Sequence, residues 1–536
     1  MTAKKKNFMT GALVLMVGGI IVKLIGALYK VPLANLVSGE AMAYYSNAYD
    51  IYTFMYIIAT AALPVVISRL VSEDVALGRY RQAKKTVRVA FMMFAVLGFA
   101  GMAFMLVFAK GLAEAMSSPE SYCAILAIAP AIFFEALMSL YRGYFQGHQD
   151  MVPTAISQII VAIIKAVFGY SLALWLNNKG YSMAIVAAGA IFGVTLGTIV
   201  GAVFLAVRRA FFKPEYNEVI EDTTCKSSGS LAKKILWIMI PITISSSVLS
   251  VTNLLDAAVV QNRLDTIAST LSNTVAMIYG SYSGYARVLF SLPTALIIPM
   301  GTGIIPSISA AFASKKIDET KDMISSTFRI SVFLALPCGI GLSVMANPIL
   351  SLLYPSKPVE VSIAAPLLRL LGPAVVFVCL VSITNVMLQA IGKEWMPVFT
   401  MFIGGGIKLI MNYIMVGTPS ININGAPIST NVCYAVITIL NLIVISKVLG
   451  KGLGILSAVV KPVIAAALCG VGAYFTYGPV ASRMGNTIGL GASICVAALV
   501  YFVSLGIMKW YRAEDVRLLP MGEKIEKILA KIGWIV

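Results

Sequence analysis

Apolar runs of about 20 residues recur along the whole chain, and short polar segments separate them. Each run is long enough to cross the hydrocarbon core of a bilayer as an α-helix. A helix satisfies its own backbone hydrogen bonds, which lipid cannot do, and the period-two alternation of a membrane β-barrel is absent from the sequence. The pattern predicts an all-α polytopic membrane protein.

Fourteen transmembrane spans follow from this pattern. They cover about residues 9–32, 45–70, 86–109, 121–144, 154–176, 183–207, 235–260, 272–299, 327–350, 361–390, 395–416, 427–446, 457–478 and 487–508. The number of spans is even, so both ends of the chain are expected on the same side of the membrane.

Lys and Arg are distributed unevenly between the two sets of connections. The set that includes both ends of the chain holds 28 of the 41 basic residues, and the opposite set holds five. Cytoplasmic loops carry the Lys and Arg excess of membrane proteins, so we expect both termini to be cytoplasmic. The apolar run behind the N-terminal lysines continues past signal-peptide length, which predicts a first membrane helix.

The two halves of the chain resemble each other at an offset of 243 residues. The segment PAIFFEALMSLYRGYFQ (130–146) aligns with PAVVFVCLVSITNVMLQ (373–389), and a polar turn, a proline and a lysine inside the next span follow in both. Six spans in each repeat make both halves enter the membrane in the same direction. This is the parallel-repeat arrangement of rocking transporters, and it predicts two lobes.

The predicted organisation has five parts. They are an N-terminal six-helix lobe (1–208), a cytoplasmic linker (209–234), a C-terminal six-helix lobe (235–450), two additional membrane helices (451–510) and a cytoplasmic amphipathic tail (511–536). In the tail, isoleucines and a leucine share one helix face and lysines another, which is typical of a helix lying on a membrane surface. A frayed basic tail is the alternative.

Composition narrows the classes of function. The chain is 59% hydrophobic and 12% charged, with a formal net charge of +18. A nucleic-acid-binding protein would gather its basic residues on a soluble domain, and the sequence predicts none, so we expect no nucleic-acid partner. One histidine and seven scattered cysteines predict neither a metal site nor a catalytic site. We expect a monomer in the lipid bilayer that is not an enzyme.

Ionisable residues inside the predicted spans indicate a ligand. The basic ones are Lys23, Lys30, Arg69, Arg142, Lys165, Arg287, Arg369 and Lys408, and the acidic ones are Asp50, Glu135 and Asp256. Such groups are costly at membrane depth and usually face a cavity or a partner. Those near the ends of spans, including Arg69, are equally explained by snorkelling to the interface. The surplus of positive charge favours an anionic ligand.

Two spans supply candidate ligands for an anion. Lys23 and Lys30 lie two turns apart, roughly 10 Å, on a face of small residues, although such a face also suits helix packing. In the eighth span Arg287 follows Tyr282 and Tyr285, whose rings suit stacking on a sugar. The same tyrosines are also compatible with an interfacial aromatic belt.

Five segments resemble the multidrug/oligosaccharidyl-lipid/polysaccharide exporter superfamily, and within it the stage V sporulation protein B-like branch of polysaccharide biosynthesis proteins and lipid II flippases. They are GGIIVKLIGALYKVPLANLVSGE (18–40), ALPVVISRLVSEDVALGRYRQAKK (62–85), YRGYFQGHQDMVPTAISQII (141–160), NLLDAAVVQNRL (253–264) and LQAIGKEWMP (388–397). The resemblance implies a V-shaped pair of lobes around a cationic cavity. It also implies a flippase of the bacterial plasma membrane that moves an undecaprenyl-diphosphate-linked sugar outward by alternating access.

The charges and tyrosines in the spans, together with the cationic cavity that the resemblance implies, give the candidate residues their expected roles. We expect the substrate to be bound by Lys23, Lys30, Arg69, Arg287, Tyr282 and Tyr285. Related flippases can bind sodium in the second lobe, which makes Asp256 and Asn412 candidates for a sodium site, or alternatively Lys408 an internal partner of Asp256. Val161 stands where family members often carry an acid, which puts a coupling role of that acid in doubt.

Three alternative functions remain at this point. A multidrug exporter of the same fold would take organic cations and would need acids in its cavity. A membrane glycosyl polymerase would need catalytic acids or a metal on a sizeable outer loop, and a scaffold would gain nothing from buried charges.

Overall fold

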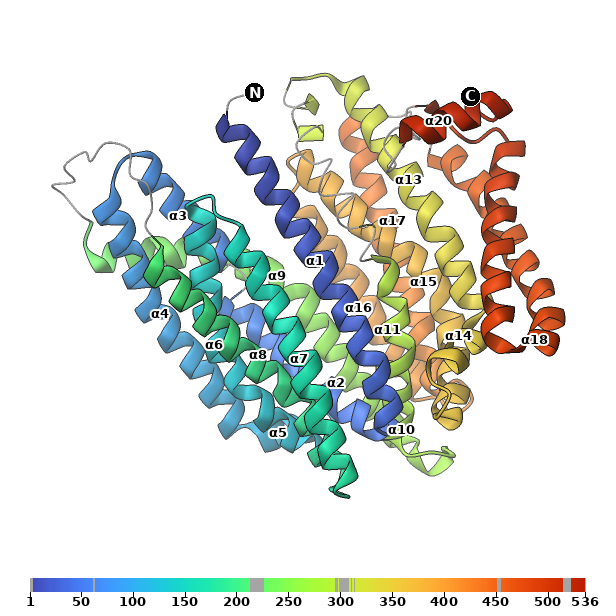
Figure 1. Ribbon diagram of the computed structural model, residues 1–536, viewed down its shortest axis with the longest axis horizontal. Helices are drawn as coiled ribbons and strands as arrows, with labels where there is room; N and C mark the ends of the chain where they lie inside the picture. The colour runs from blue at the N-terminus through green and yellow to red at the C-terminus, as the bar shows by residue number, and fades with distance from the viewer. Residues whose placement is uncertain are drawn as a thin grey trace. The chain divides into compact units, whose positions relative to one another are not determined.

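The structure, a computed structural model, describes residues 3–60, 63–212, 226–294, 297, 308, 309, 311, 312, 314–450, 455–513 and 522–535. The described chain consists of helices and the turns between them, with one isolated β-bridge between Tyr511 and Ile535 (Figure 1). It divides into two compact units, Met1–Gly280 and Ser281–Val536. They are called unit 1 and unit 2 below, and each is described by itself.

The helices of unit 1 are α1 (Ala3–Leu36), α2 (Gly39–Thr60), α3 (Leu63–Ala76), α4 (Tyr80–Val107), α5 (Ala109–Ala115), α6 (Tyr122–Gly147), α7 (Val152–Asn178), α8 (Met183–Phe211), α9 (Ser228–Thr266) and α10 (Val275–Gly280). Unit 2 opens with a π-helical turn (Ser281–Ala286) and continues with α11 (Arg287–Phe290), α13 (Ile317–Val344), α14 (Ala346–Leu353), α15 (Pro358–Ala390), α16 (Met396–Val416), α17 (Gly425–Leu449), α18 (Ile455–Ile507) and α20 (Gly522–Ile532).

Within the described residues, 11 helices are long and apolar enough to cross a membrane, compared with the fourteen predicted spans. The last two predicted spans form one element, α18, whose chain turns at Gly485 with φ 84°. The predicted span 235–260 lies inside the 39-residue helix α9. The predicted span 272–299 is divided between α10, the π-helical turn and α11, and extends beyond the described residues. The all-helical polytopic architecture is confirmed, and the count of fourteen remains a prediction.

A ridge of glycines lets α7 and α8 pack at backbone contact. The ridge occupies every fourth position of α8: Gly189, Gly193, Gly197 and Gly201. A Cβ atom added to Gly193 would lie 2.6 Å from the Cα of Gly169 on α7, closer than any side chain tolerates. Small residues at this spacing are the usual means by which membrane helices approach closely, because lipid provides no hydrophobic driving force between them.

The helix α9 packs within unit 1, although the sequence repeat assigns its residues to the second lobe. Asn47 of α2 and Gln261 of α9 exchange two side-chain hydrogen bonds, both of 2.8 Å. The following helix α10 lies so close to α2 that a Cβ at Gly280 would overlap the carbonyl group of Gly39. These contacts place the division between the compact units at residue 280, beyond the predicted linker 209–234.

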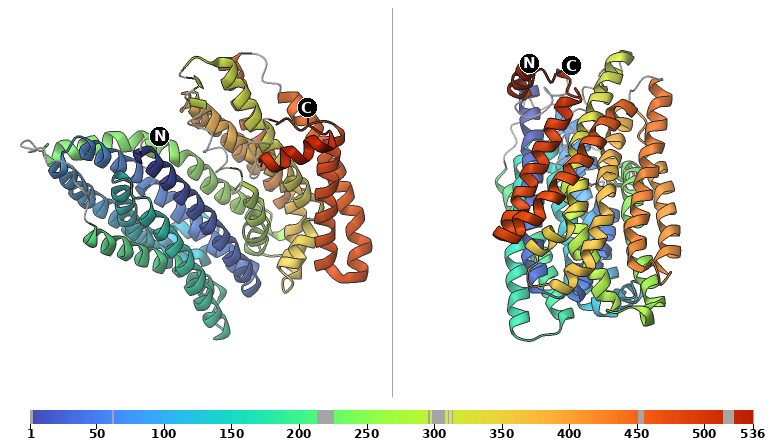
Figure 2. Two further views of the ribbon diagram at one scale, coloured as in Figure 1. Left: turned by 45° about the horizontal axis from the view of Figure 1, so that its top comes forward. Right: turned by 90° about the vertical axis from the view of Figure 1, so that its right-hand side faces the viewer.

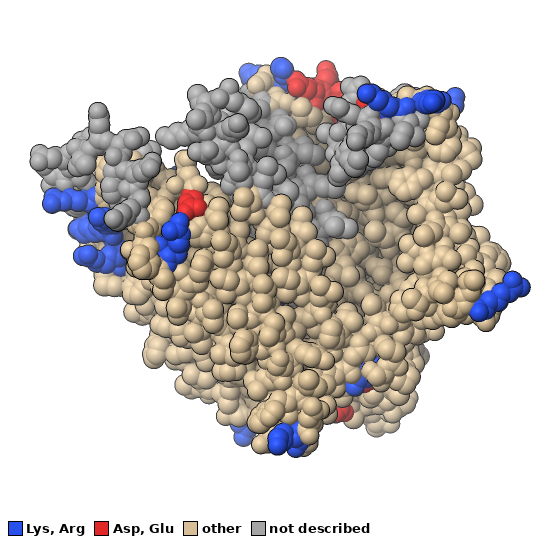
Figure 3. Space-filling model, viewed as in Figure 1, with Lys and Arg blue, Asp and Glu red and all other residues tan. Residues whose placement is uncertain are grey.

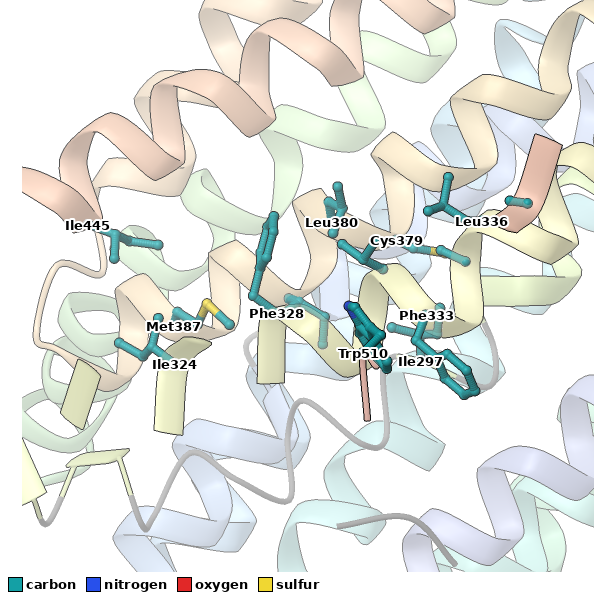
Figure 4. Packing of buried hydrophobic residues seen from close by; sticks show 14 of the residues in the cluster. Ile297, Ile324, Phe328, Phe333, Leu336, Cys379, Leu380, Met387, Ile445 and Trp510 are labelled. Atoms are coloured by element: carbon teal, nitrogen blue, oxygen red, sulfur yellow. The ribbon is translucent and has the colours of Figure 1, made fainter. Parts of the chain in front are cut away.

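Unit 2 is built around an apolar core that α13, α15, α17 and α18 share. Figure 4 shows Phe333 of α13 against Trp510, and their rings stack with centroids 5.4 Å apart. The two legs of α18 run antiparallel on either side of Gly485 (Figure 2). Leu529 of α20 and the nearby Trp534 pack against the same core, while Lys527 and Lys531 are exposed. The predicted tail therefore contains a helix with one apolar and one basic face.

Candidate functional site

Charged residues concentrate toward the ends of the helices. On the face shown in Figure 3, Lys, Arg, Asp and Glu lie near the margins, and the described surface between them is almost uncharged. This distribution is expected for helices whose middle sections face hydrocarbon. Basic residues that depart from it are therefore informative about function.

The two predicted lysines of α1 differ in exposure. Lys23 is exposed, and Lys30, two turns further on, is partly buried. Tyr29, the neighbour of Lys30, is buried, and its hydroxyl donates a 3.0 Å hydrogen bond to the carbonyl of Ala190 on α8. One side of α1 is thus packed against α8. Lys23 is exposed within a candidate membrane span, where a charged side chain raises the free energy unless it faces a cavity or a partner.

Arg69 lies on α3 and is exposed. Glu73 follows one turn later on the same helix and forms a 3.4 Å ion pair with Lys234 of α9. Residues four apart on a helix share a face, so Arg69 lies on the side of α3 that meets α9. Both roles predicted for Arg69, substrate binding and snorkelling, are compatible with this exposed position.

The predicted tyrosines of unit 2 lie in the π-helical turn. Tyr282 and Tyr285 are 3% and 0% exposed, and the Tyr285 ring packs edge-on against Tyr354 with centroids 4.6 Å apart. Arg287, directly after the turn, is only partly buried. π-Helical segments are uncommon and recur at functional sites, because the extra residue redirects the side chains around it. In this conformation Arg287 is partly buried and both tyrosine rings are buried, and their roles in substrate binding stay predictions.

The predicted ion-site residues are all buried, but they belong to different units. Asp256 lies on α9 in unit 1, whereas Lys408 and Asn412 lie one turn apart on α16 in unit 2. The side-chain amide oxygen Oδ1 of Asn412 accepts a hydrogen bond from the hydroxyl of Ser429 on α17. The sodium site and the Asp256–Lys408 pair remain predictions. Among the described residues, no group of three or more His, Cys, Asp or Glu side chains is arranged to hold a metal ion.

A lysine cluster in unit 1 is a feature that the sequence-based site did not include. Lys165 of α7 places its Nζ atom 4.9 Å from the ring centroid of Tyr49 and 5.6 Å from that of Tyr29. The ring of Tyr45 in turn stacks on the ring of Tyr49. Aromatic faces attract a cation by their quadrupole, most strongly where water is excluded. Lys165 and these three tyrosines are called the lysine cluster below. In it, aromatic rings stabilise the ammonium group of Lys165.

A ladder of tyrosines extends along α2 from this cluster. Tyr45, Tyr49, Tyr52 and Tyr56 follow one another with ring centroids 6.2, 6.0 and 6.0 Å apart. Near the far end, Glu135 and Arg142 of α6 form a buried ion pair of 3.0 Å. Tyrosines at spacings of three and four residues on one helix are the signal in the sequence that could have revealed the ladder.

Comparison with known proteins shows that the chain is similar to membrane transporters. Residues 8–312 match the family described as polysaccharide biosynthesis protein, and residues 241–414 match the MatE family. Stage V sporulation protein B of Bacillus subtilis (strain 168) is 23% identical over 523 residues, covering 96% of this chain and 98% of that protein. Lipid II flippase MurJ of the same organism is 24% identical, covering 84% of each chain.

Solved structures give the same fold. A structure of lipid II flippase MurJ in an inward closed conformation has a TM-score of 0.71 at 16% identity and covers 92% of this chain and 98% of that chain. An inward-facing multidrug resistance MATE family transporter has a TM-score of 0.66, also at 16% identity, and covers 82% of this chain and 98% of that chain. At such identities the likeness concerns the fold alone.

Proposed function

The chain belongs to the polysaccharide biosynthesis protein family within the multidrug/oligosaccharidyl-lipid/polysaccharide exporter superfamily, and on this premise we propose that it is a flippase for an anionic lipid-linked glycan. It moves an undecaprenyl-diphosphate-linked sugar, lipid II or a related polysaccharide precursor, from the inner to the outer leaflet. Two repeats of six helices expose the substrate alternately to the two sides of the membrane.

The observation that carries this proposal is the surplus of basic side chains in the predicted spans. Lys23 is exposed on α1, and Lys30 and Arg287 are only partly buried. A diphosphate offers several acceptor oxygens, and charge-assisted hydrogen bonds to lysine and arginine are roughly twice as strong as neutral ones. Lys23, Lys30, Arg69 and Arg287 are the proposed ligands of the diphosphate, and the term diphosphate site refers to these four residues. Tyr282 and Tyr285 contact the sugar only in a conformation that exposes their rings.

Glutamine variants test the diphosphate site. Lys23→Gln, Lys30→Gln and Arg287→Gln should each abolish rescue of a depletion strain while leaving the amount of protein in the membrane near normal. Arg69→Gln should be milder, because Arg69 is the most compatible with snorkelling. Lys110→Gln, at an exposed position outside the spans, is the matched control. Full rescue by all three variants would show that these positive charges are not needed to bind the substrate.

Depletion itself identifies the substrate. If the proposal holds, a lipid-linked precursor accumulates on the inner leaflet when the protein is removed, and its glycan shows whether peptidoglycan or another polysaccharide is served. The alternative function is multidrug export, which the MatE match over 241–414 favours at the level of fold. Unchanged lipid-linked precursors, together with increased sensitivity to cationic drugs, would select that alternative.

The membrane potential is the proposed driving force. Moving a diphosphate outward carries about two negative charges, and a potential that is negative inside favours this by about 2.3 kcal/mol per charge per 100 mV. A sodium site at Asp256 and Asn412 is the competing proposal. Flipping in proteoliposomes separates the two. Transport driven by a sodium gradient at zero potential, with none driven by potential alone, would select the sodium site.

The proposed orientation has both termini and the segment 209–234 in the cytoplasm. The excess of basic residues on this set of connections supports it. A single cysteine placed at Ser228, in a variant without other reactive cysteines, should stay unlabelled by an impermeant reagent in intact cells and react after lysis. Labelling in intact cells would reverse the orientation and the direction of transport with it.

A further inference from the structure

Unit 1 contains an apolar pocket that the proposed transport does not use. Helices α2, α4 and α9 line an open pocket of about 620 Å³, and of the ten described residues that line it only Thr243 has a polar side chain. The hydroxyl of Thr243 is buried and makes no hydrogen bond among the described residues. A pocket with so little polarity cannot hold a sugar, a nucleotide or an ion, because their polar groups would lose water without replacement.

The pocket opens at the surface of unit 1. Ile58 of α2, Leu97 of α4 and Ile240 of α9 line it and are 41%, 38% and 50% exposed. α2 and α4 belong to helices that are long and apolar enough to cross a membrane, and hydrocarbon chains surround such helices in a bilayer. A lipid chain can therefore reach the pocket from the bilayer without passing through water.

The size and lining of the pocket suit a hydrocarbon chain. Its volume of about 620 Å³ lies within the usual range for small-molecule pockets, about 300–1,000 Å³, and its walls offer apolar contacts and almost no hydrogen bonds. One acyl chain of an ordinary phospholipid suits such a pocket. The longer undecaprenyl chain of the proposed substrate is the competing occupant, which the experiment below distinguishes.

A basic residue lies where the headgroup of such a lipid would be. Lys233, Leu236, Ile240 and Thr243 stand at positions i, i+3, i+7 and i+10 of α9 and therefore share one face. Lys233 is exposed, and it precedes Ile240 by about 10 Å along the helix axis. Trp237 between them is 79% exposed, as is typical of tryptophans at the membrane–water interface.

We propose that this pocket binds one acyl chain of an anionic phospholipid, whose phosphate group pairs with Lys233. The chain fills the space between α9 and the helices α2 and α4, and the ammonium group of Lys233 selects a negatively charged headgroup. This lipid site shares no residue with the diphosphate site. The proposal can therefore be tested whatever the transported substrate is.

The test uses the full-length protein purified in detergent and examined by native mass spectrometry after delipidation and addition of phosphatidylglycerol. Wild type should retain one phosphatidylglycerol molecule. Ala100→Phe fills the pocket from its exposed wall and should weaken retention by at least about tenfold, or about 1.4 kcal/mol. Val96→Phe, at a 68% exposed position of the same helix outside the lining, is the matched control.

The headgroup is tested with Lys233→Gln, which should keep one lipid but lose the preference for phosphatidylglycerol over phosphatidylcholine. Lys84→Gln, at an exposed position on α4, should keep that preference. Equal retention by wild type and Ala100→Phe would overturn the site. If undecaprenyl phosphate displaces phosphatidylglycerol from wild type, and Ala100→Phe retains neither lipid, the occupant is the substrate tail and the phospholipid assignment is overturned.

Discussion

Positions 243 residues apart in the two units carry buried polar clusters of different chemistry. In unit 1, Arg142 of α6 donates 3.0 Å hydrogen bonds to Ser157 of α7 and to Glu135. In unit 2, the positions equivalent to Arg142 and Ser157 hold Asn385 of α15 and Thr400 of α16. These two residues meet at Asn441 of α17, through hydrogen bonds of 2.8 and 2.7 Å.

The comparison shows that buried polar groups can join helices without carrying a charge. The amide and hydroxyl groups of unit 2 join three helices without any ion. A buried ion pair seldom stabilises a protein more than well-packed apolar residues would, because desolvation offsets its attraction. The charges of Arg142 and Glu135 are therefore not needed to join α6 and α7. Ionisable groups buried in the membrane-spanning part of a protein usually serve its function, so this pair is a candidate for a role in transport.

The largest expected effect comes from breaking the ion pair. Glu135→Ala leaves the buried Arg142 uncompensated and should lower the free energy of unfolding by about 3–5 kcal/mol. Thermal unfolding of the purified protein measures this. The double variant Glu135→Leu/Arg142→Met should regain most of the lost stability. A double variant as unstable as the single one would show that packing, and not charge, explains the loss.

Substitution in the uncharged cluster of unit 2, formed by Asn385, Thr400 and Asn441, should lower the free energy of unfolding by less. Asn441→Ala removes partners of Asn385 and Thr400 and should cost about 1–3 kcal/mol, the usual range for buried polar groups left unsatisfied. Asn178→Ala, at an exposed position near the end of α7, should change the stability little. If Asn441→Ala costs as much as Glu135→Ala, the distinction between charged and neutral clusters fails.

A smaller effect is expected at the lysine cluster, whose counterpart in unit 2 is Lys408. A double-mutant cycle between Lys165→Met and Tyr49→Leu should give a coupling free energy of about 0.5–2 kcal/mol, the range for a cation on an aromatic face. The conservative variant Tyr49→Phe keeps the aromatic ring and should preserve most of the coupling. Additive effects in the cycle would mean that the ring faces contribute nothing to holding the lysine.

The smallest effect concerns pH. Burial lowers the pKa of His148, although its contact with the Tyr144 carbonyl opposes this. The unfolded chain then binds the proton more readily, so wild type should lose stability as pH falls below the ordinary histidine pKa of about 6.5. The equivalent position in unit 2 is Ile391, which cannot titrate. Between pH 7.5 and pH 5.5 the melting temperature should fall further for wild type than for His148→Gln, and parallel curves would refute the assignment.

Long-range contacts explain what the sequence did and did not predict. The runs of apolar residues predicted the long helices, since a single helix must match the bilayer by itself. They missed the π-helical turn at 281–286 inside the predicted span 272–299. Asn47 and Gln261 are 214 residues apart, and their pairing has no local signal. The predicted sugar-binding Tyr285 is buried by Tyr354, which only tertiary packing reveals.

The glycine ridge of α8 has a mechanical consequence. Helices separated by side chains can slide past each other because rotamers readjust, as in shear motions of domains. At the contact between Gly193 and Gly169 the backbones themselves meet, and no rotamer is available to absorb displacement. We therefore expect α7 and α8 to move together as one rigid pair. If unit 1 changes conformation during transport, the rearrangement should occur at other helix–helix contacts.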